Sequence, residues 1–229
     1  MKTLGLIGGM SPESTVSYYQ IINREVNQRL GGNHSAEMLM HSINFETIAA
    51  MQRAGDWQQA GTVLAASAKR LENMGAQAIV LATNTMHKVA PAIEQAIGVP
   101  LIHVVDAVAH AIRAQGLHKV ALLGTRFTMS DGFYTERLQA LGISAIVPPA
   151  ARQDEIHRVI FEELCRNRLT DAAKRYYLDA ITELKAQGAQ GVIFGCTEIG
   201  LLLSPEECPL PVFDSTMIHA LAAVAFALS

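Results

Sequence analysis

The sequence predicts an α/β protein of two similar α/β domains with mostly parallel sheets, related by a pseudo-twofold axis, with a site at the domain interface. Short apolar runs alternate with longer amphipathic stretches along the chain, the pattern of βαβ units. The runs are apolar throughout, as expected for strands that helices cover on both faces. A neighbourhood of the first half also recurs in the second half.

Each apolar run predicts a strand and each amphipathic stretch a helix. The expected strands are Thr3 to Ile7, Met38 to Ile43, Ala78 to Leu81, Leu101 to Val104, Val120 to Leu123, Ser144 to Val147, Val192 to Phe194 and Val212 to Phe213. The expected helices are Ser14 to Leu30, Phe45 to Ala50, Trp57 to Met74, Ala90 to Ala96, Val105 to Gln115, Thr128 to Leu141, Asp154 to Arg166, Asp171 to Gln187 and Thr216 to Leu228. Ser11 before Pro12 is a good N-cap for the first helix.

An internal repeat sets the expected domains. Residues 75–85 (GAQAIVLATNT) resemble residues 188–198 (GAQGVIFGCTE) at a constant offset of 113, which pairs Thr83 with Cys196. Leu4–Gly8 likewise resembles Val120–Gly124 at an offset of 116. We therefore expect a first α/β half over residues 1–100 and a second over 101–213, with the C-terminal helix, 214–229, packing back on the first half.

Composition narrows the functional class. The chain has 229 residues, 50% of them hydrophobic, and a net charge of −3 without a basic stripe, so we expect no nucleic-acid partner. No run reaches the roughly 18 apolar residues of a membrane span, and the N-terminus reads as a strand rather than a signal peptide. The three cysteines lack framework or metal-ligand spacing and the eight histidines are scattered. We expect a cytoplasmic protein with free thiols and no metal.

Thr83 and Cys196 both fall just past the carboxyl ends of predicted strands, where parallel sheets bind ligands. Two opposed acid/base groups are the minimum for inverting a stereocentre next to a carboxylate without a cofactor. Asn84, Thr85 and Thr197 could donate hydrogen bonds to that carboxylate, and Gly195 could let a ligand approach the backbone.

Three motifs carry a resemblance to a known family. They are Gly8 to Thr15 (GGMSPEST), Thr83 to His87 (TNTMH) and Gly195 to Ile199 (GCTEI), and together they resemble the aspartate/glutamate racemase family of PLP-independent amino-acid racemases. The resemblance implies a two-domain α/β fold, often dimeric, no cofactor, and a two-base mechanism. In that family the second-half cysteine typically works on the L-face and the first-half cysteine on the D-face.

This chain departs from the family pattern at two places. Cys196 matches the second cysteine, whereas Thr83 replaces the first, so we expect L-substrates to be processed better than D-substrates. Family members selective for aspartate hold its distal carboxylate with basic residues. Cys165 stands where one of these, a lysine, is expected, and Gln52 falls near another. Aspartate and glutamate remain the first expectation, with a neutral polar substrate such as homoserine as the alternative.

The remaining expectations concern single residues. Met10 is expected to line the site, while Glu198 or His87 could tune or shuttle protons. His110 and His219 recur in the repeat within apolar helices, which favours packing in the core or at an interface.

Two other functions stay open. One is an arylmalonate-type decarboxylase, which needs a single thiol; the other is an amino-acid-binding protein that has lost activity.

Overall fold

The structure is a computed structural model that describes residues 1–229. The chain forms two compact units: Met1–Val104 with His219–Ser229 make the first, and Val105–Ile218 make the second. Each unit contains one four-stranded sheet, in the order β2-β1-β3-β4 in the first unit and β6-β5-β7-β8 in the second. All strand pairs are parallel. The predicted fold class, two similar α/β halves with parallel sheets, is confirmed.

The elements follow in chain order. The strands are β1 (Leu4–Gly8), β2 (Met38–Ser42), β3 (Ala78–Leu81), β4 (Leu101–Ile102), β5 (Lys119–Gly124), β6 (Ser144–Ile146), β7 (Val192–Gly195) and β8 (Val212–Asp214). The α-helices are α1 (Pro12–Leu30), α2 (Phe45–Ala54), α3 (Trp57–Asn73), α4 (Ala90–Ala96), α5 (Val104–Ala114), α6 (Arg126–Ser130), α7 (Phe133–Ala140), α8 (Ala150–Glu162), α9 (Asp171–Ala186), α10 (Ile199–Leu202) and α11 (Ser215–Ala227). The 3-10 helices are η1 (Thr85–Val89), η2 (Leu164–Arg166) and η3 (Pro205–Glu207).

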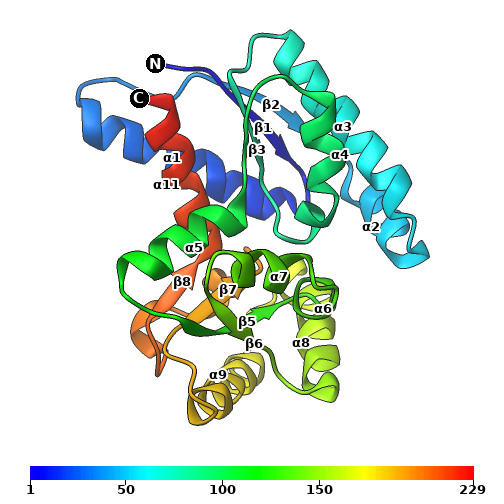
Figure 1. The fold of residues 1–229 in the computed structure, drawn as a ribbon, viewed down its shortest axis with the longest axis vertical. Coiled ribbons are helices and arrows are strands. Elements are labelled where there is room, and N and C mark those ends of the chain that lie inside the picture. Colours follow the sequence, from blue (N-terminus) through cyan, green and yellow to red (C-terminus); the bar gives the residue numbers. More distant parts are fainter. The chain divides into compact units, whose positions relative to one another are not determined.

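Helices cover both faces of the first sheet (Figure 1). Successive side chains of a strand point to opposite faces. Leu4 and Leu6 of β1 accordingly pack with α1 and α11, whereas Ile7 packs with α2, α3 and α4. The backbone N–H of Lys2 also donates to the Ala227 carbonyl at 2.8 Å, which ties the end of α11 to the start of β1.

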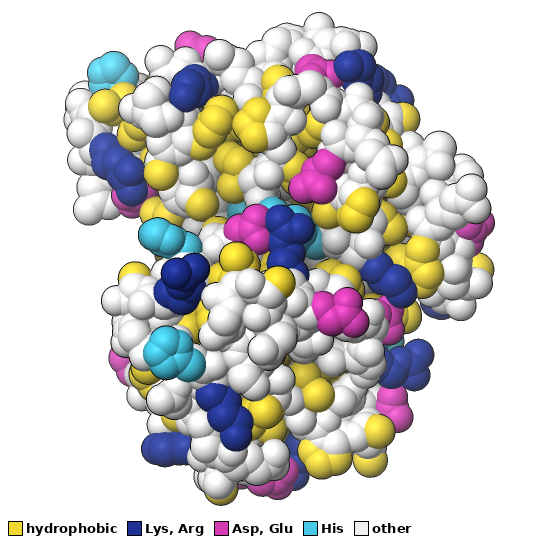
Figure 2. Space-filling view, in the orientation of Figure 1, with side chains coloured by type: hydrophobic (Ala, Val, Ile, Leu, Met, Phe, Trp, Pro, Cys, Tyr) yellow, Lys and Arg dark blue, Asp and Glu magenta, His cyan; other side chains and the backbone are white.

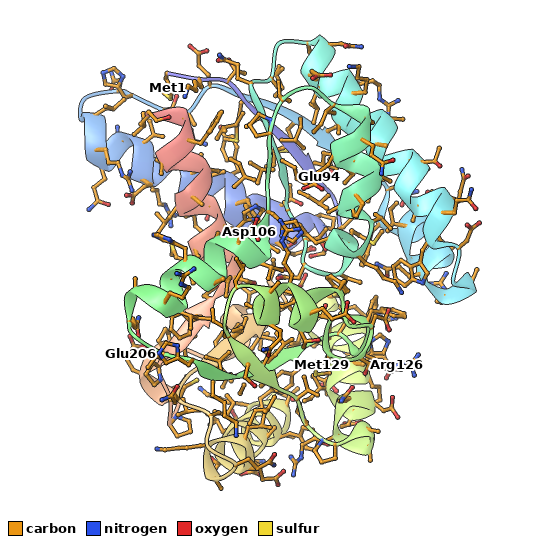
Figure 3. All side chains as sticks on the ribbon, viewed as in Figure 1. Met1, Glu94, Asp106, Arg126, Met129 and Glu206 are labelled. Carbon is orange, nitrogen blue, oxygen red and sulfur yellow. The ribbon has the colours of Figure 1, made fainter.

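Helices α8 and α9 cover one face of the second sheet. Leu123 of β5 and Phe194 of β7 pack against α8 and α9 in one hydrophobic core. At the edge of this unit Asp106 of α5, labelled in Figure 3, accepts two hydrogen bonds from Arg137 of α7, at 2.6 and 2.7 Å. Both side chains are partly exposed to solvent, so this bidentate pair positions α5 beside α7 more than it stabilises the fold.

The predicted helix from Thr128 to Leu141 is wrong as a single element. The chain forms α6 and α7 instead, because Gly132 between them has a φ of +80° that a helix cannot contain. The predicted helix Asp154 to Arg166 begins earlier, at Ala150, directly after Pro149, and gives way to η2 before Arg166. Ser11 caps α1 as predicted: its Oγ accepts from the Ser14 N–H at 3.3 Å, and Pro12 is the first helical residue.

Charges of both signs are mixed on the face of the molecule drawn in Figure 2. On the face drawn in Figure 2, Lys and Arg side chains are interspersed with Asp and Glu on each unit. None of the helices combines the length and the apolar character that a membrane span requires.

Candidate active site

In the first unit the carboxyl ends of β1 and β3 carry the predicted residues. These strands are neighbours in register, with Ile7 beside Leu81, so the turns that follow them emerge at the same sheet edge. The β1 turn contains Gly9 at a φ of +89°, where a Cβ atom would lie 2.1 Å from the Ile43 carbonyl oxygen. Only glycine fits there, and the N–H of Gly9 donates to Thr15 Oγ1 at 2.7 Å. Met10 follows, buried among apolar side chains.

The β3 turn carries Thr83, Asn84 and Thr85, all buried. The Thr83 N–H donates to the Leu81 carbonyl at 2.8 Å, and the His87 N–H donates to the Asn84 carbonyl at 3.0 Å. The turn is therefore held by backbone hydrogen bonds on both sides of the Thr83–Asn84 peptide. That leaves the Thr83 side chain at the strand end, as the sequence predicts.

Gln52 and Met86 lie together beside this turn. Gln52 Nε2 is 3.0 Å from Met86 Sδ, and Gln52 Oε1 has no hydrogen-bond partner although the side chain is buried. A buried unsatisfied amide oxygen is unfavourable unless something else satisfies it. Met10 and Met86 belong to the same hydrophobic core. We call Met10, Gln52, Thr83, Asn84, Thr85 and Met86 the Thr83 cluster.

In the second unit Cys196 directly follows β7, with a carboxylate against its sulfur. Cys196 Sγ is 2.9 Å from Glu198 Oε2, and the same oxygen accepts from Thr197 Oγ1 at 2.6 Å. Cys196 and Glu198 are buried, at 8% and 3% exposure. A thiol and a hydroxyl thus converge on one buried carboxylate oxygen.

The surroundings keep Cys196 protonated in the free protein. Burial raises the pKa of the Cys196 thiol well above its usual range, and the Glu198 and Cys165 side chains raise that pKa further. Burial also raises the pKa of Tyr177, with Cys196 and Glu198 among the charges that contribute. We call Tyr177, Cys196, Thr197 and Glu198 the Cys196 cluster.

Two residues from other elements interact electrostatically with Cys196. One is Tyr177 on α9, which sequence reasoning missed; the other is Cys165 of η2, which the sequence associates with the substrate side chain and not with Cys196. Neither lies near Cys196 in sequence, and only the packing of η2 and α9 against β7 reveals them.

Gly195 is required by packing within the sheet. A Cβ atom at this position would lie 2.8 Å from Leu122 Cδ1 and 2.9 Å from the Leu123 carbonyl oxygen. These atoms belong to the neighbouring strand, β5, so the glycine allows β5 and β7 to approach each other. This is a different reason from the close ligand approach that the sequence suggests.

The histidines separate into two environments. His110 is exposed, so packing in the core is wrong for it, whereas packing at an interface stays a prediction. His87 and His219 are buried, and the ring nitrogens of both already bind protein atoms. The proton-shuttle interpretation of His87 therefore lacks a free ring nitrogen. The structure brings together no group of three His, Cys, Asp or Glu side chains that could hold a metal ion.

The chain is similar in sequence and in fold to known amino-acid racemases. The family model for Asp/Glu/hydantoin racemase matches residues 7–223. A putative Asp/Glu racemase from Yersinia pestis has a similar structure, with a TM-score of 0.93, 49% identity and complete coverage of both chains. An aspartate racemase homologue from Pyrococcus horikoshii gives a TM-score of 0.85 at 35% identity, again with complete coverage of both chains. The broad-specificity amino-acid racemase RacX of Bacillus subtilis is 24% identical over 96% of each chain.

The chain thus shares its fold of two α/β units with these racemase structures. The chain belongs to the Asp/Glu/hydantoin racemase family. It is an isomerase, an amino-acid racemase.

Proposed function

We propose that this protein is a cofactor-independent racemase of small acidic amino acids, with aspartate or glutamate as substrate. Cys196 removes the α-proton of the L-enantiomer, and the Thr83 side returns a proton to the opposite face. The observation that carries the proposal is the 2.9 Å contact between the Cys196 thiol and the Glu198 carboxylate at the carboxyl end of β7. Thr83 occupies the repeat-equivalent position at the end of β3.

The Cys–Glu pair supplies a route for the proton. A thiol is not a base, so Cys196 must first lose its proton, and Glu198 Oε2, 2.9 Å from the sulfur, can accept it. The thiolate then takes the α-proton, which leaves a carbanion at the α-carbon, a neutral thiol at Cys196 and a protonated Glu198. The Thr83 hydroxyl gives its proton to the carbanion and regains one from solvent, while Glu198 releases its proton to solvent. The backbone N–H groups and hydroxyls of the strand-end turns would stabilise the negative charge that develops on the substrate carboxylate.

The Thr83 side is the weaker partner. A threonine hydroxyl is far less acidic than a thiol and is a poor base without an activating group. Delivery of a proton to the planar carbanion is easier for such a group than removal of a proton from the D-enantiomer. Because the equilibrium constant of a racemisation is 1, kcat/KM is the same from L to D as from D to L. The weakness of the Thr83 side should therefore appear as α-proton exchange of the L-form that outpaces its inversion.

The surroundings of Gln52 favour a second candidate substrate, an amino acid with a neutral polar side chain. Gln52 presents a buried amide with an unsatisfied oxygen and no charge. An amide can accept from a hydroxyl or donate to a carboxylate, so a neutral polar side chain such as that of homoserine fits it as well as an acidic one. The broad specificity named for RacX supports this alternative.

The expected setting of the enzyme belongs to the same proposal. We infer a cytoplasmic homodimer that acts on free amino acids without PLP. Sedimentation equilibrium tests the dimer, and unchanged activity after treatment with hydroxylamine, which strips PLP from enzymes, tests the independence from that cofactor.

The function is tested by NMR of α-proton exchange in D₂O. The L- and D-forms of aspartate, glutamate and homoserine are incubated separately with the protein and with the Cys196→Ala variant. We expect the L-form of the true substrate to exchange with the wild type and to stay silent with the variant. Release of CO₂ from an arylmalonate would instead establish the decarboxylase, and tight amino-acid binding without any exchange would establish an inactive binding protein.

A further inference from the structure

His87 is bonded through both ring nitrogens to backbone groups of the first unit. Nδ1 lies 2.8 Å from the Thr83 carbonyl oxygen, and Nε2 lies 3.3 Å from the Val104 backbone nitrogen. A carbonyl can only accept and a backbone N–H can only donate, so Nδ1 carries the proton and Nε2 accepts. The ring is 2% exposed and has one tautomer that satisfies both partners.

The two residues that His87 binds are Thr83, at the candidate site, and Val104, at the boundary between the two units. Thr83 is the proposed proton donor of the first unit. Val104 is the last residue before the chain passes into the second unit. One neutral imidazole therefore joins the Thr83 turn to the point where the chain leaves the unit.

His219 binds the segment just before Val104, and it lies where the chain re-enters the first unit. It is the first residue after the chain returns to the first unit. Its Nε2 is 2.6 Å from the Ile102 carbonyl oxygen and its Nδ1 is 2.8 Å from the Tyr18 hydroxyl. By the same reasoning, Nε2 carries the proton and Nδ1 accepts from Tyr18.

The histidine rings contact one another inside the unit. The centroid of His87 lies 4.5 Å from that of His103 and 5.6 Å from that of His219, with the rings edge to face. The residues 102–104 that end β4 and begin α5 are thus held at the Ile102 carbonyl and the Val104 amide by two buried histidines.

We propose that His87 is a positioning residue for the Thr83 side of the reaction. In its Nδ1–H tautomer it fixes the Thr83 carbonyl, and with it the direction of the Thr83 side chain, relative to the chain crossing at Val104. His219 keeps that crossing in place through Ile102. His87 acts through Thr83 and does not itself exchange a proton with the substrate. This inference rests on the proposed function.

A series of variants separates the two hydrogen bonds of His87. Asparagine places an amide near the position of Nδ1 and can still donate to Thr83, whereas glutamine places one near Nε2 and can reach only Val104. The readout is the ratio of inversion to α-proton exchange for the L-substrate in D₂O. We expect His87→Gln to lower this ratio about tenfold, the effect of one lost buried hydrogen bond, while His87→Asn keeps most of it. Exchange at the Cys196 side and KM for the L-form should change less than threefold, roughly the scatter of unrelated substitutions.

Equal losses of exchange and inversion in both variants would reduce His87 to a structural residue and overturn the proposal. So would a ratio that stays at the wild-type value in His87→Gln.

A second measurement does not depend on activity. Nitrogen-15 NMR of the histidine rings at pH 7 should show His87 protonated at Nδ1 and His219 protonated at Nε2. Observation of His87 protonated at Nε2 alone, or at both nitrogens, would overturn the assignment even if the protein proved to exchange no amino acid. Failure of the racemase proposal and failure of this inference are therefore distinguishable.

Discussion

At the scale of single residues, the chemistry of the second unit depends on one carboxylate. Glu198 Oε2 lies 2.9 Å from Cys196 Sγ, and its negative charge adds to the effect of burial in raising the thiol pKa. The side chain that would accept the thiol proton during turnover also disfavours the thiolate at rest. This protects a buried thiol from unwanted reactions while the site is empty.

The first prediction concerns this pair. Glu198→Gln removes the charge, so the pKa of Cys196 should fall and iodoacetamide should alkylate Cys196 faster at pH 8, by about tenfold for each pKa unit lost. Peptide mapping by mass spectrometry follows Cys196 separately from Cys165 and Cys208. Glu136→Gln, an exposed change on α7 of the same unit, should leave the rate unchanged. Alkylation that is no faster in Glu198→Gln would show that the carboxylate charge does not govern the thiol.

A second prediction concerns the other face of the substrate. Thr83→Cys places a stronger acid, and a far better base once ionised, at the end of β3. Turnover of the D-substrate should rise by at least about tenfold, because a general base typically contributes a factor of 10² to 10⁴. Thr83→Ser, which keeps the hydroxyl, serves as the control in a chiral chromatography assay. An unchanged D-side rate in Thr83→Cys would mean that position 83 is not an acid or base.

The sequence predicts where the candidate residues Thr83 and Cys196 lie, while their roles stay predictions. The repeat and the strand ends point to Thr83 and Cys196, which the structure places after β3 and β7. The Cys196–Glu198 contact is a local one, because the two residues lie two positions apart in the turn after β7. Tyr177 and Cys165 come from other elements, and no pattern in the sequence brings them to Cys196.

At the scale of elements, the strands and long helices were predictable and the breaks between them were not. Buried apolar runs predict β1, β3, β5 and β7 to within a residue or two. The break between α6 and α7 at Gly132 was missed, because a glycine within an amphipathic stretch can be tolerated or can take a positive φ. The short helices after β3 and β7 were also missed, since a single turn has too few residues to show a period.

The third prediction tests the approach of β5 to β7. Gly195→Ala forces a Cβ against Leu122 and the Leu123 carbonyl, which belongs to the backbone and cannot move freely. Overpacking of this kind should lower the free energy of unfolding by about 1–3 kcal/mol in urea denaturation. Gly61→Ala within α3 is the matched control: its Cβ would lie 3.2 Å from Ala92 Cβ, and the gain in helix propensity offsets this contact. Equal stability of Gly195→Ala and the wild type would contradict the packing explanation.

At the scale of the whole molecule, one architecture is used twice. The two sheets share the same strand order, and in each the central strands carry the candidate residues at their carboxyl ends. The repeat predicted this likeness. It did not predict the histidine contacts, because Tyr18 and His219 lie 201 positions apart and meet only in the folded chain.

The fourth prediction is a pH dependence of stability. Burial lowers the pKa of His219 from 6.5 to about 4. Between pH 6.5 and pH 4 the His219 side chain of the unfolded chain binds a proton that the folded chain does not. The contribution of neutral His219 to the free energy of unfolding should therefore be fully present above pH 6.5. It should be lost, by about 3 kcal/mol, as the pH falls to 4.

Urea denaturation at pH 7 and pH 5 checks this contribution. His219→Gln should flatten the difference between the two pH values, while His110→Gln, its exposed counterpart in the repeat, should not. The same pH difference in wild type and His219→Gln would assign the effect to other groups.

The most direct test of the division of labour compares Cys196→Ala with Thr83→Ala for L-aspartate, or whichever L-substrate the wild type exchanges, in D₂O. We predict that Cys196→Ala abolishes α-proton exchange from the L-form. Thr83→Ala should still exchange deuterium into the L-form with retention while forming little D-product. If Cys196→Ala keeps the wild-type exchange rate, or Thr83→Ala still forms D-product at the wild-type rate, the assignment of the two faces is wrong.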